Sequence, residues 1–127
     1  MAAESTWPDD PAPEAFHGII GKFVRFIAPE TEADGAGVHL ATSIAAGNVI
    51  GRGPHYSINF DQHHAALYGC LVGPTSGGKG QASGAGRNSV EAADSEWMKL
   101  RQAAGLSTGE GLIFHVRDAR VELRPAK

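Results

Sequence analysis

One stretch of this chain combines the residue types that bind phosphate. It reads Gly73-Pro-Thr-Ser-Gly-Gly-Lys79-Gly80, which has the G-x-x-x-x-G-K spacing of a phosphate-binding P-loop. Glycines let successive backbone N–H groups converge on phosphate oxygens, and the lysine ammonium adds positive charge at the outer phosphates. The pattern predicts a nucleotide site formed by Gly73, Pro74, Thr75, Ser76, Gly77, Gly78, Lys79, Gly80 and Gln81.

The loop departs from the usual motif at Gly80, where a serine or threonine normally supplies a hydroxyl to Mg²⁺. Thr75, Ser76, Ser83 or a water molecule are alternative ligands. We expect ATP as the nucleotide and Mg²⁺ as its metal ion. The missing hydroxyl weakens the prediction of Mg²⁺ more than the prediction of phosphate binding. A glycine-rich turn between a strand and a helix, with an exposed lysine, is the simpler interpretation of the same residues.

The segments on either side of the loop predict a strand, the loop and then a helix. Residues 66–72 form a continuous apolar run, which is typical of a strand buried on both faces. A helix is expected to start at residues 78–79, and apolar positions further on predict helix over about 89–103. Alternatively, Asp94 caps a second, shorter helix.

Two helices are predicted before the loop. Apolar residues recur at steps of three and four over 14–28, and Pro29 ends that pattern. Thr31, followed three residues later by Asp34, predicts the capped start of a second helix over about 33–49, with Gly47 and Gly51 marking its end. Three prolines in residues 1–13 predict a flexible linker, which precedes a helical region over 14–54.

Shorter elements are expected in the rest of the chain. Residues 55–60 alternate apolar and polar side chains, which predicts a half-buried strand, and 61–64 should form a polar turn. His63 and His64 in that turn are expected to be solvated rather than metal ligands. Ser107 with Glu110 forms a capping box, so the last helix should cover 108–117, and 118–127 resembles the start of a strand.

Composition excludes several classes of protein. The chain has 127 residues, a net charge of −3 and a pI near 6.0, so it lacks the strongly basic character of a dedicated nucleic-acid-binding domain. The single Cys70 lies inside the apolar run and is expected to be a buried, reduced thiol. Without a secretory signal or an apolar window of about 18 residues, we expect a cytoplasmic protein with no membrane partner.

Several segments together resemble a family of uncharacterised P-loop proteins encoded by phages, plasmids and integrated elements, which are described as primase- or helicase-like ATPases. The similar segments include GNVIGRGPH at 47–55, LYGCLVGPTSGGKG at 67–80 and GLSTGEGLIFHVRD at 105–118. The resemblance implies an α/β fold in which N-terminal helices precede a partial, truncated P-loop NTPase core of RecA-like type over 55–127. It implies nucleotide as a partner, and DNA in the full-length protein.

The resemblance also implies further strands downstream, so we expect an exposed sheet edge that favours a homo-oligomer. Hydrolysis by this chain alone is not expected, because Glu122 is the only candidate for the acidic residue that follows a later strand. Glu110 and Arg117 are secondary candidates for facing nucleotide or DNA, although a capped helix explains them equally. A non-catalytic remnant or interaction module is the alternative function, and a small-molecule phosphotransferase ranks last.

Overall fold

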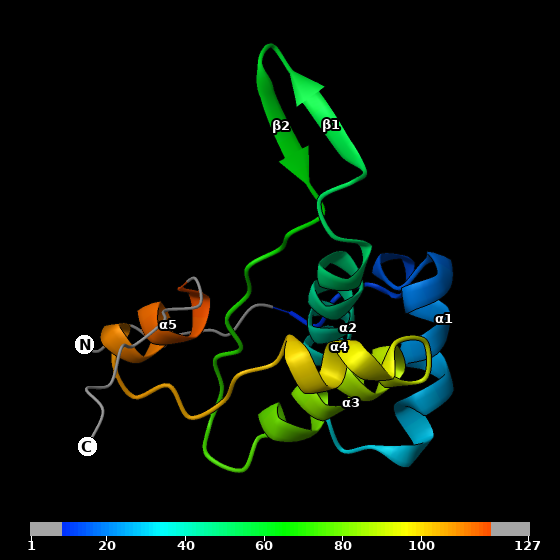
Figure 1. The fold of residues 1–127 in the computed structure, drawn as a ribbon. Helices are drawn as coiled ribbons and strands as arrows, with labels where there is room; N and C mark the ends of the chain where they lie inside the picture. Colours follow the sequence, from blue (N-terminus) through cyan, green and yellow to red (C-terminus); the bar gives the residue numbers. More distant parts are fainter. Residues whose placement is uncertain (1–8, 118–127) are drawn as a thin grey trace, which may run out of the picture.

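The computed structural model describes residues 9–117. Within this range the chain forms a mostly helical small domain with one antiparallel β-hairpin (Figure 1). Most of the predicted linker, residues 1–8, and the predicted final strand at 118–127 lie outside the described residues.

Four helices pack in chain order to form the body of the molecule. They are α1 (Gly18–Ile27), α2 (Gly35–Ile50), α3 (Lys79–Glu91) and α4 (Ser95–Leu100), and each contacts the one before it. Short 3₁₀ turns, Pro13–Ala15 and Ala28–Glu30, flank α1. The first predicted helix is thus confirmed for its central part, which turns Val24 into the core and leaves Ile19 and Phe26 exposed.

The second helix begins at a different cap from the one predicted. The Asp34 carboxylate accepts hydrogen bonds from the N–H groups of Ala36 and Gly37, so Asp34 caps α2. Thr31 instead accepts from the N–H of Ala33 inside the preceding turn. Gly47 also does not end the helix. It lies against the backbone of Ala65, and α2 continues to Ile50 before Gly51 ends it.

The core consists of two apolar clusters, both of which involve α2 and α3. One contains the buried side chains of Val24, Val38 and Ala82, and the other contains Ala45, Val90 and Trp97. Trp97 also donates a hydrogen bond from its indole Nε1 to Asn48 Oδ1, which joins α4 to α2. The two clusters lie at different levels along the α2–α3 contact and hold these helices side by side.

The hairpin projects from the helical body (Figure 1). Strands β1 (His55–Ile58) and β2 (Asp61–His64) pair with His55 opposite His64 and Ile58 opposite Asp61. The prediction of a turn over 61–64 is therefore wrong, since the turn lies at Asn59 and Phe60, with Asn59 at φ 55°. The prediction that one face of this strand is buried is also wrong, because the side chains of β1 are all exposed.

Residues 66–72 do not form the predicted central strand. This segment runs extended beside α2, but the described residues contain no neighbouring strand to pair with its backbone, and thus no parallel P-loop sheet. Tyr68 and Val72 are largely exposed, and only Leu71 packs against the first core cluster. Cys70 is exposed as well, which corrects the prediction of a buried thiol. Apolar composition indicates that a segment avoids water, but a strand also requires a hydrogen-bonding partner.

The chain after the loop forms two helices, as in the alternative prediction that Asp94 caps a second, shorter helix. α3 begins at Lys79 as predicted, but 89–103 is not one helix, since α3 ends at Glu91. The Asp94 carboxylate then accepts from the N–H groups of Glu96 and Trp97 and caps α4.

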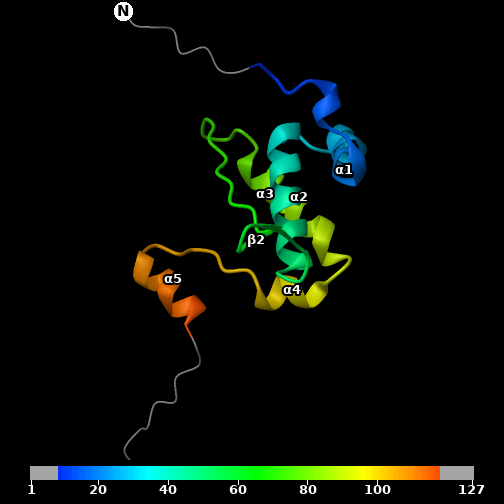
Figure 2. The same cartoon turned by 90° about the horizontal axis from the view of Figure 1, so that it is seen from above.

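The last predicted helix is confirmed as α5 (Gly109–Val116), which lies apart from the helical body (Figure 2). Its cap is Thr108, whose hydroxyl accepts from the N–H of Gly111, rather than Ser107. Among residues 9–117, no helix has the length and apolar character required to cross a membrane.

A close approach of α2 and α3 at Gly86 yields a stability test. A methyl group at Gly86 would lie 2.6 Å from the carbonyl carbon of Ala41, so Gly86→Ala should destabilise the protein by about 1–3 kcal/mol. Gly84, two residues earlier on the same helix, has only the end of the Arg87 side chain within 4 Å. Gly84→Ala should therefore stabilise by about 0.5–1 kcal/mol, as alanine does in an open helical position. Urea unfolding of both variants checks this contrast, and equal effects would contradict the close approach.

Candidate functional site

The glycine-rich loop has the backbone geometry of an anion-binding turn. Ser76 and Gly78 have positive φ angles of 66° and 68°, and the N–H of Gly77 donates to the carbonyl oxygen of Pro74 at 3.1 Å. Alternation of φ sign over such a turn directs successive N–H groups toward one concavity. Within the described residues, the N–H groups of Gly78, Lys79 and Gly80 have no hydrogen-bond partner. These donors and the positive end of the α3 dipole can therefore stabilise a phosphate oxyanion.

Lys79 lies across its own loop. Its ammonium donates to the carbonyl oxygens of Gly73, at 2.6 Å, and Pro74, at 2.8 Å. An ammonium group has three N–H donors. One donor therefore remains for a ligand. The structure thus brings together the loop residues and the lysine that the sequence predicted as a unit.

Residues far away in the sequence support the loop from behind. Gly78 lies against the turn that precedes α2, where a side chain on Gly78 would lie 3.1 Å from the Cα of Ala33. A small hollow of about 240 Å³ separates the loop from the start of α2, and Asp34, Gly37 and Ala82 contribute to its wall. This support could not be predicted from the sequence, because a contact between two distant segments leaves no local signal.

The metal-binding part of the usual motif is incomplete. Gly80 carries no hydroxyl, and the Asp34 carboxylate near the loop is already engaged by two N–H groups as a helix cap. Among residues 9–117, no group of three or more His, Cys, Asp and Glu side chains is placed to hold a metal ion. The loop residues therefore fit phosphate well, whereas Mg²⁺ at this site would depend mainly on phosphate oxygens and water as ligands.

The secondary candidates lie elsewhere. Glu110 and Arg117 belong to α5 and its end, away from the loop (Figure 2). The Arg117 guanidinium lies 3.8 Å from the centre of the Phe114 ring, a cation–π contact within that region. His63 and His64 are in β2, where His64 lies beside Arg52 and packs its ring near that of His55.

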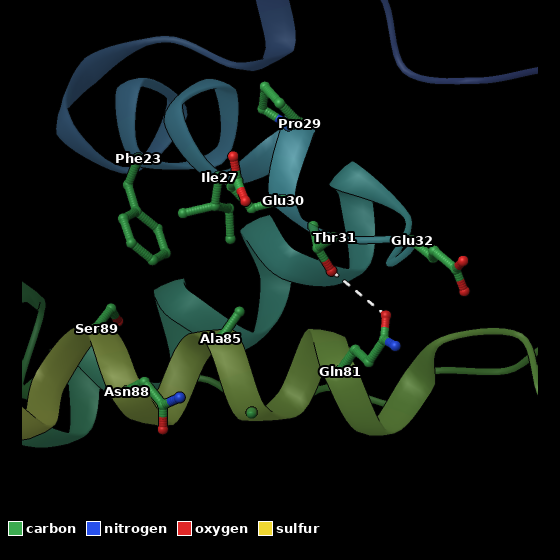
Figure 3. A pocket seen from close by; sticks show the side chains of 11 residues that line it. Phe23, Ile27, Pro29, Glu30, Thr31, Glu32, Gln81, Ala85, Asn88 and Ser89 are labelled. Carbon is green, nitrogen blue, oxygen red and sulfur yellow. Dashed lines mark hydrogen bonds between the residues drawn. The ribbon is translucent and has the colours of Figure 1, made fainter.

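Two larger hollows lie on opposite sides of α3. Neither could be predicted from the sequence. One, of about 890 Å³, lies between α3 and the end of α1 and contains Gln81 and Asn88 (Figure 3). The other, of about 580 Å³, lies between α2, α3 and α4 and contains Lys79 and Arg87. The spacing along α3 places Gln81 and Asn88 on one helix face and Lys79 and Arg87 on another. Each face becomes concave only because other helices pack beside it.

Comparison with known protein families, with curated proteins and with solved structures finds no match to this chain.

The support behind the loop gives a prediction for its conformation. Gly78→Ala introduces a side chain at φ 68° and against Ala33, which should destabilise the protein by about 1–2 kcal/mol, the cost of a left-handed conformation for a non-glycine residue. Gly80→Ala is the matched control, because a side chain at Gly80 has nothing within 4 Å. Urea unfolding measures both variants. Unchanged stability of Gly78→Ala would contradict this loop geometry.

Proposed function

We propose that this chain binds the phosphates of a nucleotide, with ATP as the expected ligand, at the loop formed by residues 73–81. The observation that carries the proposal is the combination of free N–H donors at the start of α3 with the Lys79 ammonium, which donates to the carbonyl oxygens of Gly73 and Pro74 in the same loop. An ammonium beside converging N–H groups favours an anion of several charges over a neutral ligand. The shape of the loop, set by Ser76 and Gly78, supports a phosphate group in particular.

The wider role that we propose is the nucleotide-binding part of a primase- or helicase-like ATPase of a mobile element, which acts on DNA in the full-length protein. The order of segments that resemble that family supports this role. Hydrolysis by the described residues alone is not part of the proposal, because the usual hydroxyl is missing at Gly80 and Asp34 is engaged as a cap.

The alternative is an interaction module without productive nucleotide binding. A specific observation favours it: large apolar side chains are exposed on two neighbouring segments, Tyr56 and Phe60 on the hairpin and Tyr68 and Val72 on the run before the loop. Exposed apolar groups of this kind favour self-association or a protein partner. These exposed side chains support a homo-oligomer in either case.

A thermal-shift experiment separates the two functions. ATP should raise the melting temperature of the protein, because a ligand at 100 times its Kd stabilises the folded state by about 2.7 kcal/mol. Lys79→Ala should abolish the shift, since it removes the positive charge over the loop. Lys99→Ala, which removes an exposed lysine on α4, should retain it. No shift of the unmodified protein at millimolar ATP with Mg²⁺ would rule out nucleotide binding by this chain.

A second substitution tests the role of the missing hydroxyl. Gly80 has open space around it, so Gly80→Ser can be accommodated and places a hydroxyl where the usual motif has one. We expect Mg²⁺ to increase the ATP affinity of Gly80→Ser by about tenfold, which corresponds to 1.4 kcal/mol, and that of Gly80→Ala much less. Titration calorimetry with and without Mg²⁺ measures the difference. Equal Mg²⁺ dependence in both variants would show that position 80 does not face the metal.

A further inference from the structure

The two hollows beside α3 differ in charge. The hollow between α1 and α3, which we call the acidic hollow, is lined by Glu30 and Glu32 and, among the described residues, by no lysine or arginine. The hollow between α2, α3 and α4, which we call the basic hollow, is lined by Lys79, Arg87 and Arg101 and by no described aspartate or glutamate. Both begin at the first turn of α3, next to the phosphate-binding loop.

This separation of charge gives a bound nucleotide a direction. Phosphates carry several negative charges, so they are attracted to the basic side and repelled by the carboxylates of the other. A nucleoside is uncharged, and its hydroxyls and base amino groups can donate hydrogen bonds to carboxylate oxygens. From the loop, the phosphates should therefore extend toward Lys79, and the nucleoside toward Glu30.

The acidic hollow also has the size and lining that a nucleoside requires. Its volume of about 890 Å³ falls within the usual range for small-molecule sites, about 300–1,000 Å³. Phe23 and Ile27 point from α1 toward α3 and form an apolar wall that suits the face of a base, and Pro29 also lines the hollow (Figure 3). Asn88 of α3 also lines the hollow, and its amide can both donate and accept hydrogen bonds.

A hydrogen bond at the entrance connects the hollow to the loop. Thr31 donates from Oγ1 to Gln81 Oε1 at 3.4 Å (Figure 3). That distance is long for a hydroxyl donor, so the bond contributes little and both groups remain available to a ligand. Gln81 follows Lys79 and Gly80 in the first turn of α3, which makes it the point where the phosphate loop and the acidic hollow meet.

We propose that the acidic hollow is the nucleoside subsite, in which Glu30 accepts from ribose hydroxyls, Asn88 bonds to the base edge, and the base packs on Phe23, Ile27 and Pro29. This inference rests on the proposed phosphate binding at the loop. It specifies the ligand as a ribonucleoside triphosphate rather than an inorganic polyphosphate.

The test compares ATP with inorganic tripolyphosphate by titration calorimetry on the full chain, in the presence of Mg²⁺. A site for phosphates alone would bind tripolyphosphate at least as tightly as ATP, because tripolyphosphate carries as much charge. We expect ATP to bind at least about tenfold more tightly, the effect of one or two additional hydrogen bonds and an apolar contact.

Two variants assign that preference to the hollow. Gly84 lies on the wall of the hollow and on the same face of α3 as Gln81 and Asn88, so Gly84→Leu fills the space without removing an existing side chain. Gly84→Leu should reduce the affinity for ATP to that for tripolyphosphate. The affinity of this variant for tripolyphosphate should differ from that of the unmodified protein by less than about twofold. Asn88→Ala should weaken ATP binding about three- to tenfold. Gly109→Leu, at an open position of α5, is the matched control and should keep the preference for ATP.

The outcomes are distinguishable. If tripolyphosphate binds and ATP binds no better, or if Gly84→Leu keeps the preference for ATP, the nucleoside subsite is refuted and phosphate binding at the loop stands. If neither ligand binds, the proposed function itself is refuted, and the subsite with it.

Discussion

Close packing of α2 against α3 positions the other parts of this molecule. Gly86 lets α3 approach the backbone of α2 at Ala41, and both core clusters draw side chains from these two helices. Because α3 is held in this way, its first turn faces the start of α2, and the turn at Ala33 supports Gly78 from behind. The conformation of the glycine-rich loop is thus a consequence of helix packing. A side chain at Gly86 would disturb the contact of α3 with α2, and a side chain at Gly78 would disturb the support of the loop by Ala33.

The loop has this support without the sheet that usually accompanies it. Residues 66–72 lead into the loop as an extended segment, held on α2 at Gly69 and in the core at Leu71. Its backbone has no strand partner among the described residues, and its other apolar side chains face solvent. Phosphate binding depends on donors within the loop and helix, which are in place. Hydrolysis depends on metal and water ligands from other elements, which the described residues do not bring to this site.

Charge is distributed unequally on the two sides of α3, and this follows from its neighbours as much as from its own residues. Arg87 and Lys79 share one side of the helix with Arg101 from the end of α4. On the other side, Gln81 and Asn88 face Glu30 in the turn after α1. A ligand with a charged and an uncharged part would therefore have a preferred direction along the start of α3.

Features that depend on local interactions can be predicted from the sequence. The P-loop spacing predicts the start of α3 at Lys79, a cap at Asp94 predicts α4, and apolar periodicity predicts α1. These signals act within one or two turns of the chain. Three features arise only from the tertiary structure, namely the pairing of residues 61–64, the exposure of residues 66–72 and the two hollows. Each of these depends on which distant segment supplies a backbone partner or a covering surface, and a pattern of apolar residues encodes the need for such a partner but not its presence.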